Sequence, residues 1–224
     1  MAWIQVATSS KSLGMHGDFH VLTPQNASAV PALYFLHDYA QDAAMLLRHM
    51  AFENYIGVRP LAVVLPNGHN SCWQKPENGI DYPGFIKTEL PDKCEGWFNF
   101  SPGERYIGGI GIGGYGALSA GLSGGFSRIL CIDAVIDAHA FISEISNAEH
   151  ADFVLAHAEK NLQCGGKKPR IYLACTKPER LGENKKFAEY LIAQGFDVIT
   201  DFIAADSKHT QSVINNAFNW LFSA

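Results

Sequence analysis

Two patterns of apolar and polar positions alternate along the chain, short apolar runs and longer amphipathic stretches. The short runs predict eight strands, over residues 3–8, 19–23, 32–37, 61–66, 105–111, 128–133, 170–175 and 196–203. The amphipathic stretches predict helices over residues 40–55, 82–93, 114–123, 138–161, 183–194 and 210–222. Strands and helices thus follow one another along most of the chain, as they do in α/β proteins.

The predicted strands differ in how strictly they alternate. Those near the amino terminus alternate in part, as a hairpin does, whereas the later ones are almost continuously apolar, as strands covered on both faces by helices are. We therefore expect an α/β fold with a mostly parallel sheet and an antiparallel entry. Because no repeat, low-complexity tract or linker interrupts the 224 residues, we expect one domain over residues 1–224.

Composition narrows the classes of function. The formal charge of -5 comes from 17 basic and 22 acidic residues that are interleaved, so neither nucleic acid nor a membrane is expected as a partner. Five cysteines without a CxxC pair, and an amino terminus unlike a signal peptide, predict a cytoplasmic protein with free thiols. The nine histidines show no HxH or HExxH spacing, so no metal or other cofactor is expected.

The stretch RYIGGIGIGGYGALSAG, residues 105–121, is a glycine-rich turn between a predicted strand and a predicted helix, and it fits two motifs. In the first, Gly109, Gly111 and Gly114 satisfy the dinucleotide fingerprint GxGxxG. Its position argues against it, because that fingerprint normally opens its domain, whereas four predicted strands precede it here. The second motif is the nucleophile elbow GxSxG, which fits at every position except the third, where Gly111 replaces serine.

Further motifs occur in the order typical of one esterase family. The chain reads LYFLHD at 33–38, VVLPN at 63–67, ELP at 89–91, GIGIGGYGAL at 109–118, ACTKPERL at 174–181 and GFDV at 195–198. On these motifs it resembles the α/β-hydrolase esterases of the tributyrin esterase and S-formylglutathione hydrolase (esterase D) group. The resemblance spans nearly the whole chain and implies the α/β-hydrolase fold, with hydrolysis of short acyl esters or thioesters as the activity.

The resemblance assigns three positions to a catalytic triad. Gly111 stands at the serine position, His209 is the candidate base, and Glu179 falls at the position of the acid. Simpler roles compete with two of these assignments, since Glu179 could be an exposed loop residue and His209 could cap a helix or face solvent. The region 134–168, which often carries an insertion over the site in these esterases, is short and predicts a reduced cap.

The oxyanion hole implied by the resemblance is formed by backbone N–H groups. We expect them to come from Ile112 and from Asp38 or Tyr39. Asp38 itself replaces a glycine of the family motif. Its simpler interpretation is a helix N-cap for the stretch that begins at Ala40.

Four further residues are candidates for the lining of the pocket. They are His37, which ends the predicted strand over 32–37, and Asn67, His69 and Trp73, which follow the predicted strand over 61–66. His37 could instead be structural, packed under the oxyanion loop, and His69 and Trp73 could be surface-loop residues.

The replacement of the serine decides the expected activity. Gly111 has no hydroxyl to form an acyl-enzyme, so we expect an esterase-family protein that is inactive or severely impaired, a pseudoenzyme. The alternatives are a non-catalytic protein that binds a small acyl ester, a thioester-like ligand or a partner, and a protein that binds a nucleotide at the glycine-rich loop. The sequence leaves a homo-oligomer open.

Overall fold

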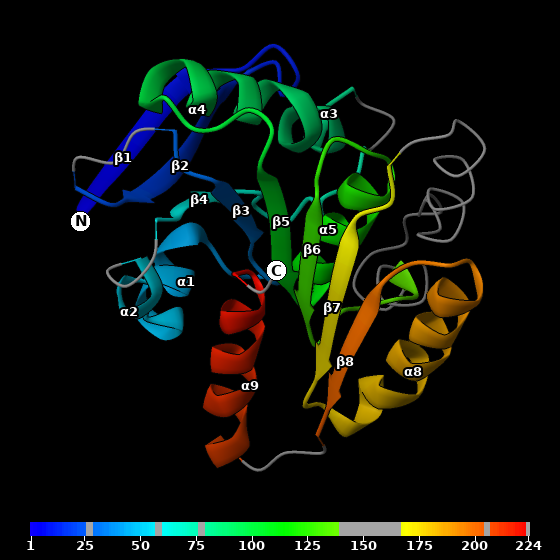
Figure 1. Ribbon diagram of the computed structural model, residues 1–224. Coiled ribbons are helices and arrows are strands. Elements are labelled where there is room, and N and C mark those ends of the chain that lie inside the picture. The colour runs from blue at the N-terminus through cyan, green and yellow to red at the C-terminus, as the bar shows by residue number, and fades with distance from the viewer. Residues whose placement is uncertain (26–28, 57–59, 76–78, 139–166, 204–206, 223–224) are drawn as a thin grey trace.

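A sheet of eight strands forms the centre of the structure, in the order β1-β2-β4-β3-β5-β6-β7-β8 (Figure 1). The computed structural model describes residues 1–25, 29–56, 60–75, 79–138, 167–203 and 207–222. The strands are β1 (Ala2–Ser9), β2 (His16–Thr23), β3 (Ala32–Leu36), β4 (Ala62–Pro66), β5 (Arg105–Ile110), β6 (Arg128–Ile132), β7 (Arg170–Cys175) and β8 (Val198–Phe202). β2 is antiparallel to both β1 and β4, and the remaining pairs are parallel, so the predicted mostly parallel sheet with an antiparallel entry is confirmed.

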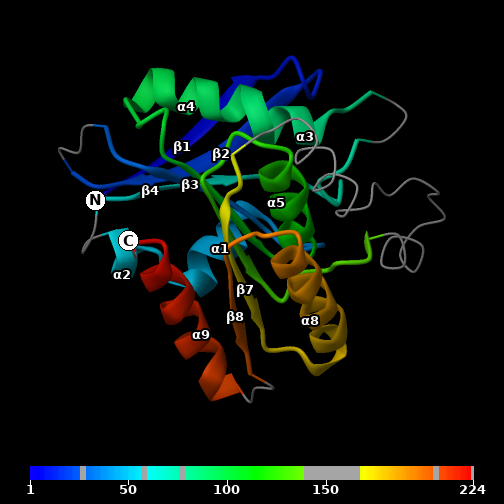
Figure 2. The ribbon, with the colours of Figure 1, turned by 45° about the vertical axis from the view of Figure 1, so that its right-hand side comes forward.

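Helices cover both faces of this sheet (Figures 1 and 2). One face carries α3 (Tyr82–Gly84), a π-helical turn η1 (Phe85–Glu89), α4 (Leu90–Phe98), α5 (Ile112–Leu122) and α8 (Pro178–Ala193). The other carries α1 (Ala43–Met50), α2 (Glu53–Ile56) and α9 (Ser207–Trp220). Within the described part of the chain, no helix combines the length and the apolar character needed to span a membrane.

The two helical layers explain why the inner strands are apolar throughout. Successive side chains of a strand point to opposite faces, so along β3 Tyr34 and Leu36 join one apolar cluster, while Leu33 and Phe35 join the other. All four side chains are fully buried. A strand buried in this way shows no alternation in its sequence, which is the pattern of the run over 32–37.

The predicted helices over 40–55 and 183–194 differ from those observed. The stretch over 40–55 forms α1 and α2, separated at Ala51, whose φ of 44° ends α1. α1 begins after Asp42, whose carboxylate accepts a hydrogen bond from the Met45 N–H at 2.7 Å. The N-cap role expected of Asp38 is therefore wrong. α8 begins at Pro178 rather than at residue 183, because proline is favoured in the first turn of a helix.

Some predictions concern residues outside the described part of the chain. The helix over 138–161 is one of them, and so is most of the reduced cap over 134–168, because residues 139–166 are not described. Of the cysteines, Cys72, Cys94, Cys131 and Cys175 are described, and each carries a buried, free thiol.

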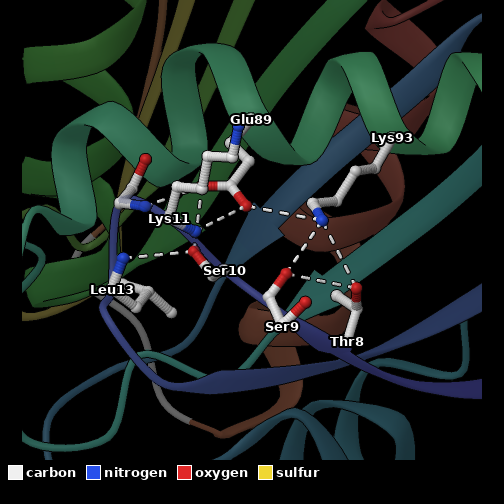
Figure 3. A network of polar contacts seen from close by, with 8 residues as sticks. Thr8, Ser9, Ser10, Lys11, Leu13, Glu89 and Lys93 are labelled. Carbon is white, nitrogen blue, oxygen red and sulfur yellow. Dashed lines mark hydrogen bonds and ion pairs between the residues drawn. The ribbon is translucent and has the colours of Figure 1, made fainter.

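The ELP motif anchors the turn that joins β1 to β2 (Figure 3). The Glu89 carboxylate accepts hydrogen bonds from Ser10 Oγ and Ser12 N, each at 2.9 Å, and from Lys11 N at 3.1 Å. Lys93 Nζ lies 3.4 Å from Glu89 Oε1 and completes the network. Burial alone would raise the pKa of Glu89, but these hydrogen bonds outweigh it and hold the pKa at about 2.

Candidate active site

The turn from β5 into α5 has the geometry of a nucleophile elbow. Gly111 lies at its tip with φ 61° and ψ -123°, a conformation that glycine adopts without a Cβ penalty. A Cβ on Gly109 would lie 2.2 Å from the carbonyl oxygen of Gly113, and a Cβ on Gly113 would lie 2.3 Å from that of Leu36. Side chains would collide on either side of the tip, and this explains the flanking glycines.

The Asp38 carboxylate occupies the space that a side chain at position 111 would need. A Cβ placed on Gly111 would lie 2.1 Å from both Cγ and Oδ1 of Asp38, and 2.2 Å from Oδ2. Oδ1 accepts hydrogen bonds from the N–H groups of Ile112 and Tyr39, each at 2.9 Å. The structure thus brings two of the expected oxyanion-hole donors together, around a carboxylate of the chain itself.

The position of Asp38 at the start of α5 stabilises its negative charge. Ile112 is the first residue of this helix of 11 residues, and the first N–H groups of a helix lack partners within the helix. They carry the positive end of the helix dipole, which favours an anion at this point. In an esterase that anion is the developing oxyanion of the reaction, whereas here it is a permanent part of the protein.

His37 and Trp73 pack at the loop that follows β3 and carries Asp38 and Tyr39, here called the oxyanion loop. His37 Nε2 accepts a hydrogen bond from the Gly68 N–H at 2.9 Å, so Nδ1 carries the proton and donates to the Asp38 carbonyl oxygen at 2.7 Å. Burial lowers the pKa of His37, which favours this neutral form. Trp73 is 3% exposed, and its indole N–H donates to the His37 carbonyl oxygen at 3.0 Å. Both side chains therefore support the loop structurally.

A surface pocket of about 400 Å³ lies beside this loop, at the carboxyl ends of β3 and β4. It is lined by Gln41, Asp42, Asn67, His69 and Asn70. Asn67 and His69 are thus at the pocket, whereas His37 and Trp73 are not among its lining residues.

Contacts within the chain hold both Asn67 and His69. Asn67 Oδ1 accepts from the Ala43 N–H at 2.7 Å, and Asn67 Nδ2 donates to Asp18. His69 Nδ1 lies 3.3 Å from the Tyr82 hydroxyl oxygen. The side of the pocket formed by the loop after β4 is therefore largely fixed in position.

The acidic residues that follow β6 and β7 differ in burial and in their hydrogen bonds. Glu179 is exposed in the first turn of α8. Asp133, at the end of β6, is 3% exposed, and its Oδ1 accepts from the N–H groups of Thr176 and Lys177 at 2.6 and 3.0 Å. Its Oδ2 accepts from Thr176 Oγ1 at 2.9 Å. Asp133 therefore ties the loop after β7 to the end of β6.

His209 belongs to the first turn of α9, after β8, and the position of its side chain lies outside what the structure describes. The assignment of His209 and Glu179 to a triad therefore stays a prediction. Among the described residues, no group of three or more His, Cys, Asp or Glu side chains is arranged to hold a metal ion. Burial raises the pKa of the Cys72 thiol to about 11, which leaves it a poor substitute nucleophile at neutral pH.

The role of the Asp38 side chain was missed in the sequence. Its contact with Ile112 joins residues 74 positions apart, beyond the range of any local pattern. A signal nevertheless exists, because the two departures from the family motifs are reciprocal. The chain has a large residue where the family has glycine, at position 38, and glycine where the family has a larger residue, at position 111.

A sequence comparison finds one curated relative that is an esterase. An acetyl esterase of Caldicellulosiruptor saccharolyticus is 28% identical over 219 residues, which cover 84% of this chain and 82% of that protein. No family model matches the chain.

Solved structures match over nearly the whole chain. The fluorophosphonate-binding serine hydrolase F of Staphylococcus aureus, with substrate bound, has a TM-score of 0.87 at 21% identity, covering 100% of this chain and 99% of that one. An S-formylglutathione hydrolase from the same organism has a TM-score of 0.85 at 22% identity, with 99% of each chain covered. The sheet, the elbow and these matches define an α/β-hydrolase fold. Within that fold, the resemblance to the esterases is confirmed by the acetyl esterase match.

Proposed function

We propose that this chain is a pseudo-hydrolase, which binds a small ligand at the esterase site of its fold without performing the serine esterase reaction. The observation that carries the proposal is the position of the Asp38 carboxylate. It occupies the space that a side chain at position 111 would need, and it accepts hydrogen bonds from the N–H groups of Ile112 and Tyr39. In this proposal the protein acts as one domain, residues 1–224, with a reduced cap over 134–168.

Two separate losses argue against ester hydrolysis. Gly111 offers no hydroxyl to attack an acyl carbonyl, so no acyl-enzyme can form. The N–H groups that would stabilise a tetrahedral oxyanion already bind the Asp38 carboxylate, and a second negative charge beside it would be repelled. Removal of one oxyanion-hole donor costs about 10²–10³-fold in kcat in a serine protease, so occupation of both donors is a severe loss.

A ligand-binding role is supported by what remains of the site. The pocket of about 400 Å³ beside the oxyanion loop is large enough for a molecule the size of a short acyl ester. The related acetyl esterase and S-formylglutathione hydrolase carry small acyl groups in their names, and we infer that this pocket takes a ligand of similar size.

The geometry gives no support to nucleotide binding at the glycine-rich loop. A pyrophosphate would have to bind at the amino end of α5, where the Asp38 carboxylate already lies. The dinucleotide fingerprint also expects an acidic residue at the end of the next strand to bind the ribose. Asp133 has this position, but it directs both carboxylate oxygens at the loop after β7.

The test is a set of four proteins: the parent chain, Gly111→Ser, Asp38→Gly, and the double variant that carries both changes. Hydrolysis of p-nitrophenyl acetate and butyrate is measured for each, with thermal unfolding as a check on the fold. We expect no turnover by the parent or by Asp38→Gly, since both lack a nucleophile. Gly111→Ser should also be inactive and less stable, because Asp38 fills the space of the new side chain.

Only the double variant has both a hydroxyl and an open oxyanion hole. If His209 and Glu179 complete its triad, it hydrolyses both esters, and a fluorophosphonate labels the new serine, which intact-mass spectrometry detects. Turnover by the parent chain would contradict the proposal, and its loss in Asp38→Gly would show that Asp38 takes part in the reaction. An inactive double variant would leave the proposal standing and would reject the assignment of His209 and Glu179.

A further inference from the structure

Among the described residues, three carboxylates each accept two backbone N–H groups and so hold loops of this protein, and one of them differs from the others. Glu89 uses both of its oxygens, Oε1 for Lys11 and Oε2 for Ser10 and Ser12. Asp133 likewise uses both oxygens for the loop after β7. Asp38 uses Oδ1 alone, and within the described residues nothing hydrogen-bonds to its Oδ2.

The Asp38 oxygen that accepts no hydrogen bond within the described residues lies at the tip of the elbow. Oδ2 is 2.2 Å from the position of a Cβ on Gly111, and Cγ and Oδ1 are each 2.1 Å from it, so the whole carboxylate stands where the side chain of the family serine would project. The Asp38 side chain is only partly buried. A ligand that reaches the elbow therefore meets a carboxylate oxygen instead of a hydroxyl.

This arrangement reverses the charge that the site prefers. The hole of an esterase offers N–H donors to an oxygen that becomes negative. Here those donors are taken, and the group exposed to a ligand is a hydrogen-bond acceptor with negative charge. An ester carbonyl or a carboxylate is repelled, whereas an N–H donor with positive charge gains a charge-assisted hydrogen bond.

The pocket beside the loop, whose lining residues do not include Asp38, has the same charge preference. Gln41 and Asp42 continue the loop from Asp38, and the Gln41 N–H donates to the Asp38 carbonyl oxygen at 3.3 Å. The lining consists of one carboxylate, three carboxamides and one imidazole, without a lysine or arginine. An anionic ligand would find no permanent positive charge in this lining.

We propose that the exchange of residues at positions 38 and 111 has changed the ligand class of the site, from an acyl ester to a small organic ammonium ion held by Asp38 Oδ2. The inference rests on the proposed function, since it names the class of ligand that the pseudo-hydrolase binds. The pocket volume sets the scale, an alkylammonium of a few carbons.

The test compares three probes of similar shape and different charge: n-butylammonium, 1-butanol and butyrate. Binding is followed in ¹⁵N-labelled protein by the amide signals of Ile112 and Tyr39, because their N–H groups bind the Asp38 carboxylate. Asp38→Asn removes the charge but keeps the shape. Asp92→Asn, at an exposed position on α4, removes one negative charge elsewhere and serves as the matched control.

We expect n-butylammonium to shift both signals and to bind more tightly than the other probes. Asp38→Asn should weaken its binding on the order of 10- to 100-fold, the value of a charge-assisted hydrogen bond, and Asp92→Asn should leave it unchanged. In Asp38→Gly the hole is open, so the preference should reverse toward butyrate.

Two results would overturn the inference. Tighter binding of butyrate or 1-butanol than of n-butylammonium by the parent would reject the ammonium class but keep a ligand-binding pseudo-hydrolase. An n-butylammonium affinity unchanged by Asp38→Asn would do the same. Absence of binding by all three probes would reject both this inference and the ligand-binding part of the proposed function.

Discussion

The turn between β1 and β2 and the elbow between β5 and α5 are both held by a carboxylate, and the two carboxylates are used differently. Glu89 at the first turn accepts three hydrogen bonds, faces Lys93, and has its pKa held at about 2. Asp38 at the elbow accepts two N–H groups on one oxygen and keeps the other oxygen free among the described residues. The first carboxylate only stabilises structure, whereas the second can also meet a ligand.

Among carboxylates that each accept two backbone N–H groups, this difference separates those that only hold a loop from one that can also meet a ligand. A carboxylate has about four lone-pair positions, and one that holds a loop through two or more N–H groups is expected to use both oxygens, unlike the helix cap Asp42, which uses Oδ1 alone. Asp133 follows the structural pattern although it lies at the carboxyl end of β6, where catalytic groups gather in such sheets. Three substitutions test the distinction.

The largest effect is expected at Asp133. In Asp133→Ala, the N–H groups of Thr176 and Lys177 and the Thr176 hydroxyl lose their acceptor in a buried setting, so the free energy of unfolding should fall by about 3 kcal/mol or more. Urea denaturation measures it. Thr176→Val, which removes a single hydrogen bond, is the control and should cost about 1 kcal/mol. A loss below about 1 kcal/mol in Asp133→Ala would place Asp133 outside the structural class.

An intermediate effect is expected at Glu89, and it depends on pH. The pKa of Glu89 is lowered from 4.5 to about 2, so its stabilisation is complete above pH 4.5 and is lost as the pH falls toward 2. Glu89→Gln should lower the free energy of unfolding by about 1–2 kcal/mol at pH 7, after allowance for solvent screening, and should lack this acid-sensitive part. Urea titrations at a series of pH values measure it.

The exposed Glu104, changed to Gln, is the matched control and should keep the pH dependence of the parent. If the parent and Glu89→Gln lose stability in parallel between pH 4.5 and pH 2, the carboxylate does not anchor the turn as described.

The smallest effect on stability is expected at Asp38. Asp38→Ala leaves the N–H groups of Ile112 and Tyr39 without their acceptor, but the side chain is only partly buried and water can replace it. The free energy of unfolding should change by about 1 kcal/mol or less. A loss as large as that of Asp133→Ala would erase the contrast between the two carboxylates and would make Asp38 a structural residue.

Much of the fold could be predicted from the sequence, because its signals are local. All eight predicted strands exist, and the bounds of β7 agree to the residue, since an apolar run of this length between turn residues is a strong strand signal. The start of α8 was predicted too late because Gly182 lies within the helix, and glycine is a poor helix former. Pro178 gave the better signal for the start.

The candidate site was harder to predict, because its meaning depends on contacts between distant segments. The residues over 109–113 are enough to predict the elbow and to show that Gly111 has no hydroxyl. The use of the Asp38 side chain depends on where the loop after β3 lies relative to the start of α5, and β3 and β5 are neighbours only in the sheet. The local context instead favoured a helix cap, a role that Asp42 takes.

If the chain descends from an esterase with glycine at 38 and serine at 111, the shared space of Asp38 and Gly111 favours one order of the two substitutions. In an ancestor with glycine at 38 and serine at 111, gaining the aspartate first would force its carboxylate against the serine Cβ, at a separation of 2.1 Å. Glycine at both positions leaves an empty hole instead. We therefore expect a stepwise path to lose the serine before it gains the aspartate. Once both changes are present, a reversion to serine at position 111 alone would place the new side chain against the Asp38 carboxylate. The aspartate at position 38 therefore makes a return of the serine unfavourable.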